Sequence, residues 1–182
     1  DNISNPGNTG MSFYAEIPDP ALTGMNSSPD FGAYPPDGYF CINTTNTFDF
    51  SVTDPDGDDL IYSLVDPLDG NMMSNSTSAA PYPPVVWLAP YNLSNIVGGT
   101  PSMSIDSQTG IITAKPTVQG TFVFAVKVSQ YRNSINIGET TVDIQYQSIL
   151  CDSCFSSSVE ELQSDFSIFP NPVNDNLRII SD

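Results

Sequence analysis

Residues 48–64 read FDFSVTDPDGDDLIYSL, and this stretch decides the fold class. Phe48, Phe50 and Val52 alternate with polar residues, which is typical of a strand because successive side chains point to opposite faces. An acidic Asp-Pro-Asp-Gly turn follows, and residues 60–64 then resume the alternation. The stretch therefore predicts two short strands joined by a turn.

Similar patterns recur along the chain and extend this prediction. The further candidate strands are residues 39–42, 85–88, 103–105, 111–113, 122–128 and 142–146. Helical periodicity is nearly absent, with only residues 156–163 suited to a helical turn, and 16 prolines favour edges, loops and strand starts. Several short strands with these turns over ~110 residues predict an all-β fold, an immunoglobulin-like antiparallel β-sandwich of about seven strands.

The charge of the chain excludes several classes of function. Asp and Glu number 21 against 4 basic residues, which gives a formal net charge of −17. Such a field repels nucleic acid and anionic membrane, so we expect no nucleic-acid partner and no membrane insertion. No histidine is present, which excludes His-activated nucleophiles and His-ligated zinc. No pair of carboxylates is singled out by an apolar pocket, and we expect a protein that is not an enzyme, with no catalytic residues.

The two ends of the chain differ in composition from the centre. Residues 1–25 include the strand-like run MSFYAEI, which predicts the last strand of a preceding β domain followed by a junction. Residues 152–165 are rich in Ser and Glu and predict a linker. The chain opens on Asp1 within polar sequence, so we expect an export signal upstream.

Two blocks of sequence resemble the cadherin-like, putative-Ig repeats of bacterial surface proteins. They are residues 53–64 (TDPDGDDLIYSL) and residues 104–113 (SIDSQTGIIT), the second followed by a proline and a GTF run. The resemblance covers about residues 30–150 and implies a cadherin-like Ig-type sandwich, with a domain over residues 26–151. It also implies a structural or adhesive role at the cell surface, with neighbouring repeats of the same chain, and a surface glycan or protein, as partners.

A second resemblance lies near the C-terminal end. Residues 166–179 (FSIFPNPVNDNLRI) are similar to the first strand and turn of a type A sorting domain, with its Pro-Asn-Pro turn at Pro170, Asn171 and Pro172. Residues 166–182 would then be the first strand of a truncated type IX sorting domain. The resemblance implies contact with the type IX secretion machinery and an extracellular or cell-surface location in a Gram-negative bacterium. A chain captured as cargo of that machinery is an alternative.

The acidic turn is the candidate metal site. Asp54, Asp56 and Asp58 alternate around Gly57, and a calcium ion prefers six to eight oxygen ligands at ~2.3–2.6 Å. The alternative is a plain β-turn with solvated aspartates. A strand over residues 39–42 that runs away from the junction would bring the turn back beside residues 26–30. The candidate calcium ligands are therefore Asp54, Asp56, Asp58, Asp59, Asn26 and Asp30.

The three cysteines predict one structural disulfide. Cys41 ends the first strand of the sandwich and Cys151 ends the last, and in such sandwiches these strands run side by side in parallel, so we expect Cys41 to pair with Cys151. Cys154 is the alternative partner. The Cys-Asp-Ser-Cys spacing could also indicate a redox pair, but the run does not open a helix after a buried strand.

Three aromatic residues lie among prolines in one loop. Tyr82, Trp87 and Tyr91 could stack on sugars if the rings were exposed and coplanar, which predicts a ligand-binding surface for glycans. The other interpretation places Trp87 in the core, as for most single tryptophans of a sandwich. The alternative function is therefore a carbohydrate-binding module of a secreted polysaccharide-degrading enzyme.

Overall fold

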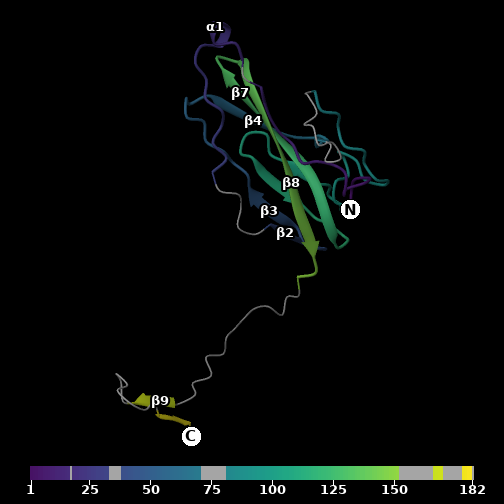
Figure 1. Ribbon diagram of the computed structural model, residues 1–182, viewed down its shortest axis with the longest axis vertical. Coiled ribbons are helices and arrows are strands. Elements are labelled where there is room, and N and C mark those ends of the chain that lie inside the picture. The colour runs from purple at the N-terminus through teal and green to yellow at the C-terminus, as the bar shows by residue number, and fades with distance from the viewer. Residues whose placement is uncertain (17, 33–37, 71–80, 152–165, 170–177, 182) are drawn as a thin grey trace. The chain divides into compact units, whose positions relative to one another are not determined.

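The computed structural model describes residues 1–16, 18–32, 38–70, 81–151, 166–169 and 178–181 (Figure 1). The chain divides into two compact units, Asp1–Leu150 and Cys151–Asp182. The described residues form antiparallel sheets and one four-residue helix, α1 (Pro20–Thr23), which Asp19 caps by accepting the N–H of Ala21. The all-β prediction is therefore confirmed.

The larger sheet has five strands. Its path is β1 (Phe13–Glu16), β8 (Ile135–Ile149), β7 (Gly120–Arg132) and β4 (Asp59–Val65), all antiparallel to their neighbours. The fifth strand, β2 (Tyr39–Cys41), pairs in parallel with the C-terminal end of β8. The long β7 and β8 strands cross the whole unit in Figure 1.

The β7–β8 hairpin turns on two residues, Asn133 and Ser134. Their φ angles are 52° and 65°, and Arg132 pairs with Ile135 directly across the turn. Positive φ at both turn positions matches the right-handed twist of the strands, and asparagine tolerates it better than most residues. The candidate strands 122–128 and 142–146 are therefore the central parts of one much longer hairpin.

The smaller sheet has three strands, in the order β3 (Asn46–Asp49), β6 (Ile111–Ala114) and β5 (Ser104–Ile105). The predicted strand over 48–52 stops early, at Asp49. The Asp49 carboxylate accepts the N–H of Ser51 at 2.9 Å, and the Tyr62 hydroxyl accepts the N–H of Val52 at 3.0 Å. At Ser51 and Val52, side chains therefore take the place of a neighbouring strand as hydrogen-bond acceptors for the backbone N–H groups.

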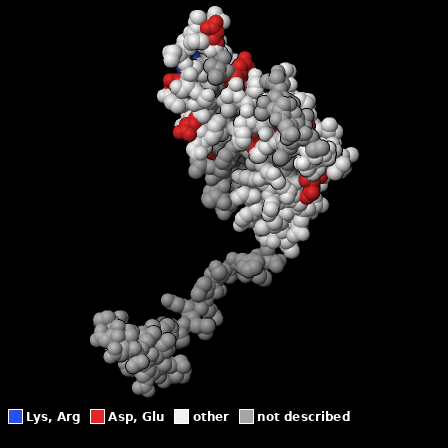
Figure 2. Space-filling model, in the orientation of Figure 1, with Lys and Arg blue, Asp and Glu red and all other residues white. Residues whose placement is uncertain are grey.

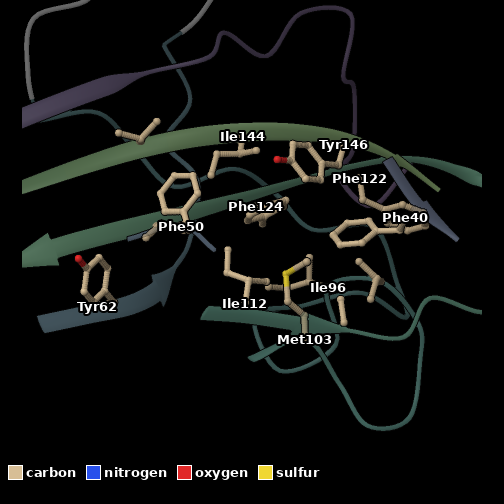
Figure 3. Packing of buried hydrophobic residues seen from close by; sticks show 14 of the residues in the cluster. Phe40, Phe50, Tyr62, Ile96, Met103, Ile112, Phe122, Phe124, Ile144 and Tyr146 are labelled. Carbon is tan, nitrogen blue, oxygen red and sulfur yellow. The ribbon is translucent and has the colours of Figure 1, made fainter. Parts of the chain in front are cut away.

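The core is built from side chains of both sheets (Figure 3). The larger sheet contributes alternate residues of its two longest strands, and the smaller sheet contributes the inward residues of β6. These residues are Phe122, Phe124, Val126, Val128, Val142, Ile144, Tyr146, Ile112 and Ala114. Phe122 and Phe124 are 0% and 1% exposed, so the period-two pattern correctly identified the buried face.

The N-terminal segment belongs to this same unit, which corrects the prediction for residues 1–25. β1 pairs with β8 from Phe13↔Val142 to Glu16↔Glu139. Asn2 is fully buried; its amide donates to the carbonyl of Val123 at 2.7 Å and accepts the N–H of Val123 at 2.9 Å. Residues hydrogen-bonded to the sheet in this way are part of the domain. The prediction failed because a strand-like run in a sequence does not show which sheet the strand joins.

Residues 85–88 form no regular strand, which corrects a second prediction. The segment pairs at single positions: Trp87 bridges Ile3, and Val85 donates its N–H to the carbonyl of Pro67 at 2.9 Å. The prolines around it lack the N–H that a continuous ladder requires. The segment thus lies with residues 1–4 and 67–68 against the larger sheet.

The second unit contains one described strand pair. β9 (Phe166–Phe169) is antiparallel to β10 (Arg178–Ser181), with Phe169 opposite Arg178. The predicted helical turn at residues 156–163, the linker over residues 152–165 and the Pro170–Asn171–Pro172 turn lie outside the described residues. Within the described residues, none of the helices has the length and apolar character needed to cross a bilayer.

Candidate metal centre

The three alternating aspartates of the acidic turn converge in space. One carboxylate oxygen from each of Asp54, Asp56 and Asp58 lies within 4.8 Å of the other two, so the three could hold a metal ion. Gly57 has a φ of 80°, a left-handed conformation that glycine adopts without a steric penalty, and its N–H donates to the carbonyl of Asp54. The turn between β3 and β4 therefore positions these carboxylates through its own backbone.

Asp54 organises the turn. Its Oδ1 accepts the N–H groups of Asp56 at 2.8 Å and Asp58 at 3.1 Å, and its Oδ2 accepts the side-chain amide of Gln130 at 2.6 Å. Burial acts to raise the pKa of Asp54, but the hydrogen bonds from the turn and from Gln130 outweigh it and leave the pKa below its ordinary value. Asp54 is therefore ionised at neutral pH, as a metal ligand must be.

Asp58 is paired with an arginine from the tip of the β7–β8 hairpin. The Nε and Nη2 atoms of Arg132 each donate to one Asp58 oxygen at 2.6 Å, a two-point contact with a carboxylate that is only 4% exposed. The hydrogen bond and the charge of Asp58, against some burial, raise the pKa of Arg132, and Asp56 and Asp54 add to the effect. Arg132 is thus fixed in place as part of the cluster.

Arg132 and Gln130 also bind the segment that follows α1. Arg132 Nη1 donates to the carbonyl of Met25 at 3.0 Å, and Gln130 donates to the carbonyl of Ser27 at 2.7 Å. Asp56 accepts the N–H of Ser27 at 2.5 Å. The acidic turn, the hairpin tip and residues 23–27 therefore share one hydrogen-bond network, and Figure 2 shows acidic side chains at this end of the domain.

The junction lies beside the acidic turn as the strand directions predicted, because Asp30 and Thr53 form an antiparallel bridge. The side chains of the junction have other partners, however. Asn26 donates to Gln130 at 3.1 Å and accepts from Arg132 at 3.4 Å, and the Asp30 carboxylate accepts the N–H of Gly32 at 2.8 Å.

Asp59 is the first residue of β4 and is exposed. Of the five predicted acidic ligands, the structure therefore gathers Asp54, Asp56 and Asp58 into a cluster, while Asp59 and Asp30 are not members of it. Asn26, the sixth predicted ligand, contacts Gln130 and Arg132, which bind Asp54 and Asp58.

The cluster has a net negative charge that a divalent cation could offset. Three carboxylates face one guanidinium, so the local formal charge is −2 when all are ionised. Sequence reasoning missed Arg132 and Gln130, which lie more than 70 residues away and reach the turn through the register of β7 against β4. The signal in the sequence was the turn itself, where residues 54–59 include four aspartates, a density of negative charge that calls for a cationic partner.

Cys41 and Cys151 are both disulfide-bonded. Cys41 lies opposite Ile149 in the parallel β2–β8 pair, so the first and last strands of the predicted sandwich do run side by side. Cys154 lies outside the described residues. A structural disulfide indicates folding in an oxidising, non-cytoplasmic compartment.

The three aromatic residues of the proline-rich loop do not share one surface. Trp87 and Tyr91 pack against the core, with the Trp87 indole N–H donating to Asp66 at 2.8 Å and the Tyr91 ring 5.6 Å from that of Phe122. Tyr82 lines a different pocket beside Tyr14. This geometry gives no support to a common face for stacking on sugars.

Comparison with known proteins finds no matching family model, no matching curated protein and no matching solved structure.

Proposed function

We propose that this chain is a non-catalytic structural or adhesive domain of an exported surface protein, and that its acidic turn binds Ca²⁺. The observation that carries the proposal is the convergence of Asp54, Asp56 and Asp58 at the point where residues 23–27 cross the hairpin tip. A divalent cation there offsets the excess negative charge of the cluster and stiffens this junction. Oxygen-only ligands on a surface turn suit Ca²⁺ better than a softer metal ion.

The architecture supports an immunoglobulin-like, cadherin-like sandwich of about seven strands. Two sheets enclose one core, and the first strand of the predicted sandwich, β2, pairs in parallel with the last, β8. In such a domain the loops cluster at the two poles. The acidic turn is at the pole that also carries α1 and the tip of β7 (Figure 1), where a bound calcium ion would hold residues 23–27 to the hairpin tip.

The disulfide and the C-terminal sequence support export. A disulfide is stable outside the cytoplasm, and the high negative charge keeps an extracellular domain soluble. The run that resembles a type IX sorting domain contains β9 and the first residues of β10, which pair antiparallel as a hairpin would require. We therefore propose that the parent protein leaves a Gram-negative cell through the type IX secretion machinery.

A calcium titration tests the metal site directly. Isothermal calorimetry of the whole chain should show one saturable site for Ca²⁺, with a dissociation constant in the range of ~0.1–1 mM that is typical of extracellular modules. Asp56→Asn should weaken binding at least tenfold, because it removes one ligand charge while its side-chain oxygen still accepts the Ser27 N–H. Asp59→Asn is the matched control, since Asp59 lies outside the cluster.

Equal affinity in wild type and Asp56→Asn, or no saturable binding by wild type, would refute the calcium site.

A further inference from the structure

A cavity of about 200 Å³ lies on the far side of the β7–β8 sheet from the core, under the N-terminal segment. Its walls are mostly apolar and include Ile3, Leu68, Val85 and Val123. Pro6 and Met11 also line it and are exposed to solvent, so the cavity can be reached from outside. The volume is that of roughly six or seven water molecules, which is enough for a small organic group.

One buried carboxylate, that of Asp143, lies in this apolar wall. Asp143 of β8 is 2% exposed, and its Oδ2 accepts the N–H of Ser12 at 2.8 Å. Its Oδ1 has no hydrogen-bond partner among the residues that the structure describes. Burial raises the pKa of Asp143 to about 6, although hydrogen bonds from the N–H groups of Ser12 and Leu68 act to lower it. At neutral pH this buried carboxylate oxygen therefore depends on a donor from inside the cavity, either water or a ligand, because a buried polar atom without a partner is costly.

The charged groups around Asp143 do not supply this donor. Lys127 lies on the same face of the sheet, two residue pairs beyond the pair that Asp143 makes with Ala125, but its ammonium binds Glu139 at 3.1 Å. Asp1, the other acid in the cavity wall, accepts the N–H of Thr121 at 2.8 Å, and Asp69 nearby accepts the N–H of Gly10 at 3.2 Å. The α-ammonium of Asp1 is also engaged, because it donates to the carbonyl of Thr121. The other groups around Asp143 are acidic or neutral, and they attract a cation.

We propose that this cavity binds a primary alkylammonium group, the chemistry shared by a lysine side chain and a short aliphatic amine. The ammonium would donate to Oδ1 of Asp143 while the alkyl chain contacts the apolar wall. A bare metal ion would find too few oxygens in such a wall, since a hard cation takes six or more. A guanidinium presents a planar fork suited to two free oxygens, whereas one free oxygen matches a compact ammonium. This proposal is independent of the calcium site.

The test uses n-butylammonium chloride as the probe, in a buffer free of amines, with n-butanol as the neutral probe of the same shape. The side-chain carboxyl resonance of Asp143 is followed by ¹³C NMR across pH with and without the probe. We expect saturable binding in the millimolar range and a pKa of Asp143 lowered by at least about one unit, because a bound cation favours the ionised carboxylate. Binding should also weaken about tenfold for each pH unit below about 6.

Asp143→Asn should weaken n-butylammonium binding at least tenfold, while the exposed Asp106→Asn leaves it unchanged. An unchanged pKa of Asp143, or n-butanol binding as tightly as n-butylammonium, would overturn the proposal. The pH titration is made on wild type, so it shows whether the probe changes the pKa of Asp143 even if Asp143→Asn folds poorly. A blocked Gly-Lys-Gly peptide then separates the two sources: binding of the peptide as well as the free amine identifies a lysine side chain, and binding of the amine alone identifies a small amine.

Discussion

Replacing Asp143 by asparagine removes a buried charge and keeps an oxygen to accept the Ser12 N–H. Burial raises the pKa of this carboxyl from 3.8 to about 6, so the folded domain holds a proton that the unfolded chain has already lost between these values. The stability that this proton contributes is complete below the unfolded pKa and is lost as the pH rises through about 6. At 1.36 kcal/mol per pKa unit, the full contribution is about 3 kcal/mol.

The assay is urea unfolding of wild type and Asp143→Asn at about pH 7.5 and about pH 4.5, in buffers without amines. Linkage places about 2 kcal/mol of the contribution between these two pH values. Wild type should therefore gain about 2 kcal/mol in free energy of unfolding relative to the variant when the pH is lowered. Subtracting the free energy of unfolding of the variant from that of wild type removes the contribution of every other titrating group, because independent groups contribute equally to both proteins.

Asp106→Asn is the control for this measurement. The N–H groups of Thr109 and Gln108 lower the pKa of Asp106, so its contribution to stability is lost only as the pH falls through its folded pKa, below 3.8. The wild-type difference from this control should be the same at both pH values. If the difference between wild type and Asp143→Asn is also the same at both, Asp143 is not a desolvated carboxylate and the reasoning fails.

Other parts of the structure give three further predictions. Replacing Cys41 and Cys151 by serine should lower the free energy of unfolding by about 4–5 kcal/mol, because the bond closes a loop of roughly 110 residues; equal urea midpoints in oxidised and mutant protein would contradict this. Phe124→Ala should cost about 3–5 kcal/mol because this side chain is 1% exposed, whereas Phe13→Ala, on β1 at 64% exposed, should change stability by less than about 0.5 kcal/mol; similar losses in both would argue against the core assignment. Arg132→Gln should lower the melting midpoint without calcium and enlarge the rise on adding it, because Asp58 loses its paired cation; a smaller calcium effect than in wild type would count against the charge balance of the cluster.

Much of the fold could be predicted because the core strands obey a period of two. Phe122 and Phe124 on β7 and Ile144 on β8 alternate with more polar residues, and all three point into the core. The parallel β2–β8 pair beside the disulfide was also predictable, because the first and last strands of such sandwiches run side by side. These features follow from local pattern and from the fold class that the pattern indicates.

The contributions of the N-terminal segment could not be predicted in the same way. Asn2 is a polar residue whose buried position depends on the backbone of Val123, more than 100 residues away. Asp143 occupies what the alternation marks as an exposed position, but residues 1–12 cover that face of the sheet. A period-two pattern identifies one buried face, and it cannot show that a distant segment covers the other.

The candidate metal site was predictable in part for a similar reason. Asp54, Asp56 and Asp58 converge because they lie on one short turn, and local geometry is enough to bring them together. Arg132 and Gln130 join them through the pairing of β4 with β7, which only the tertiary structure defines. The sequence could therefore nominate the carboxylates, while their partners required the fold.

The melting midpoint of the whole chain with calcium and with chelator tests the central claim most directly. At about 10 mM Ca²⁺, ~10–100 times the dissociation constant of a typical extracellular site, binding contributes about 1.4–2.7 kcal/mol. For a domain of this size we expect the midpoint to rise by roughly 3–10 °C over that in chelator. The rise should disappear in Asp56→Asn and persist in Asp59→Asn. An unchanged midpoint in wild type, or an equal rise in Asp56→Asn, would contradict a calcium-stiffened junction at the acidic turn.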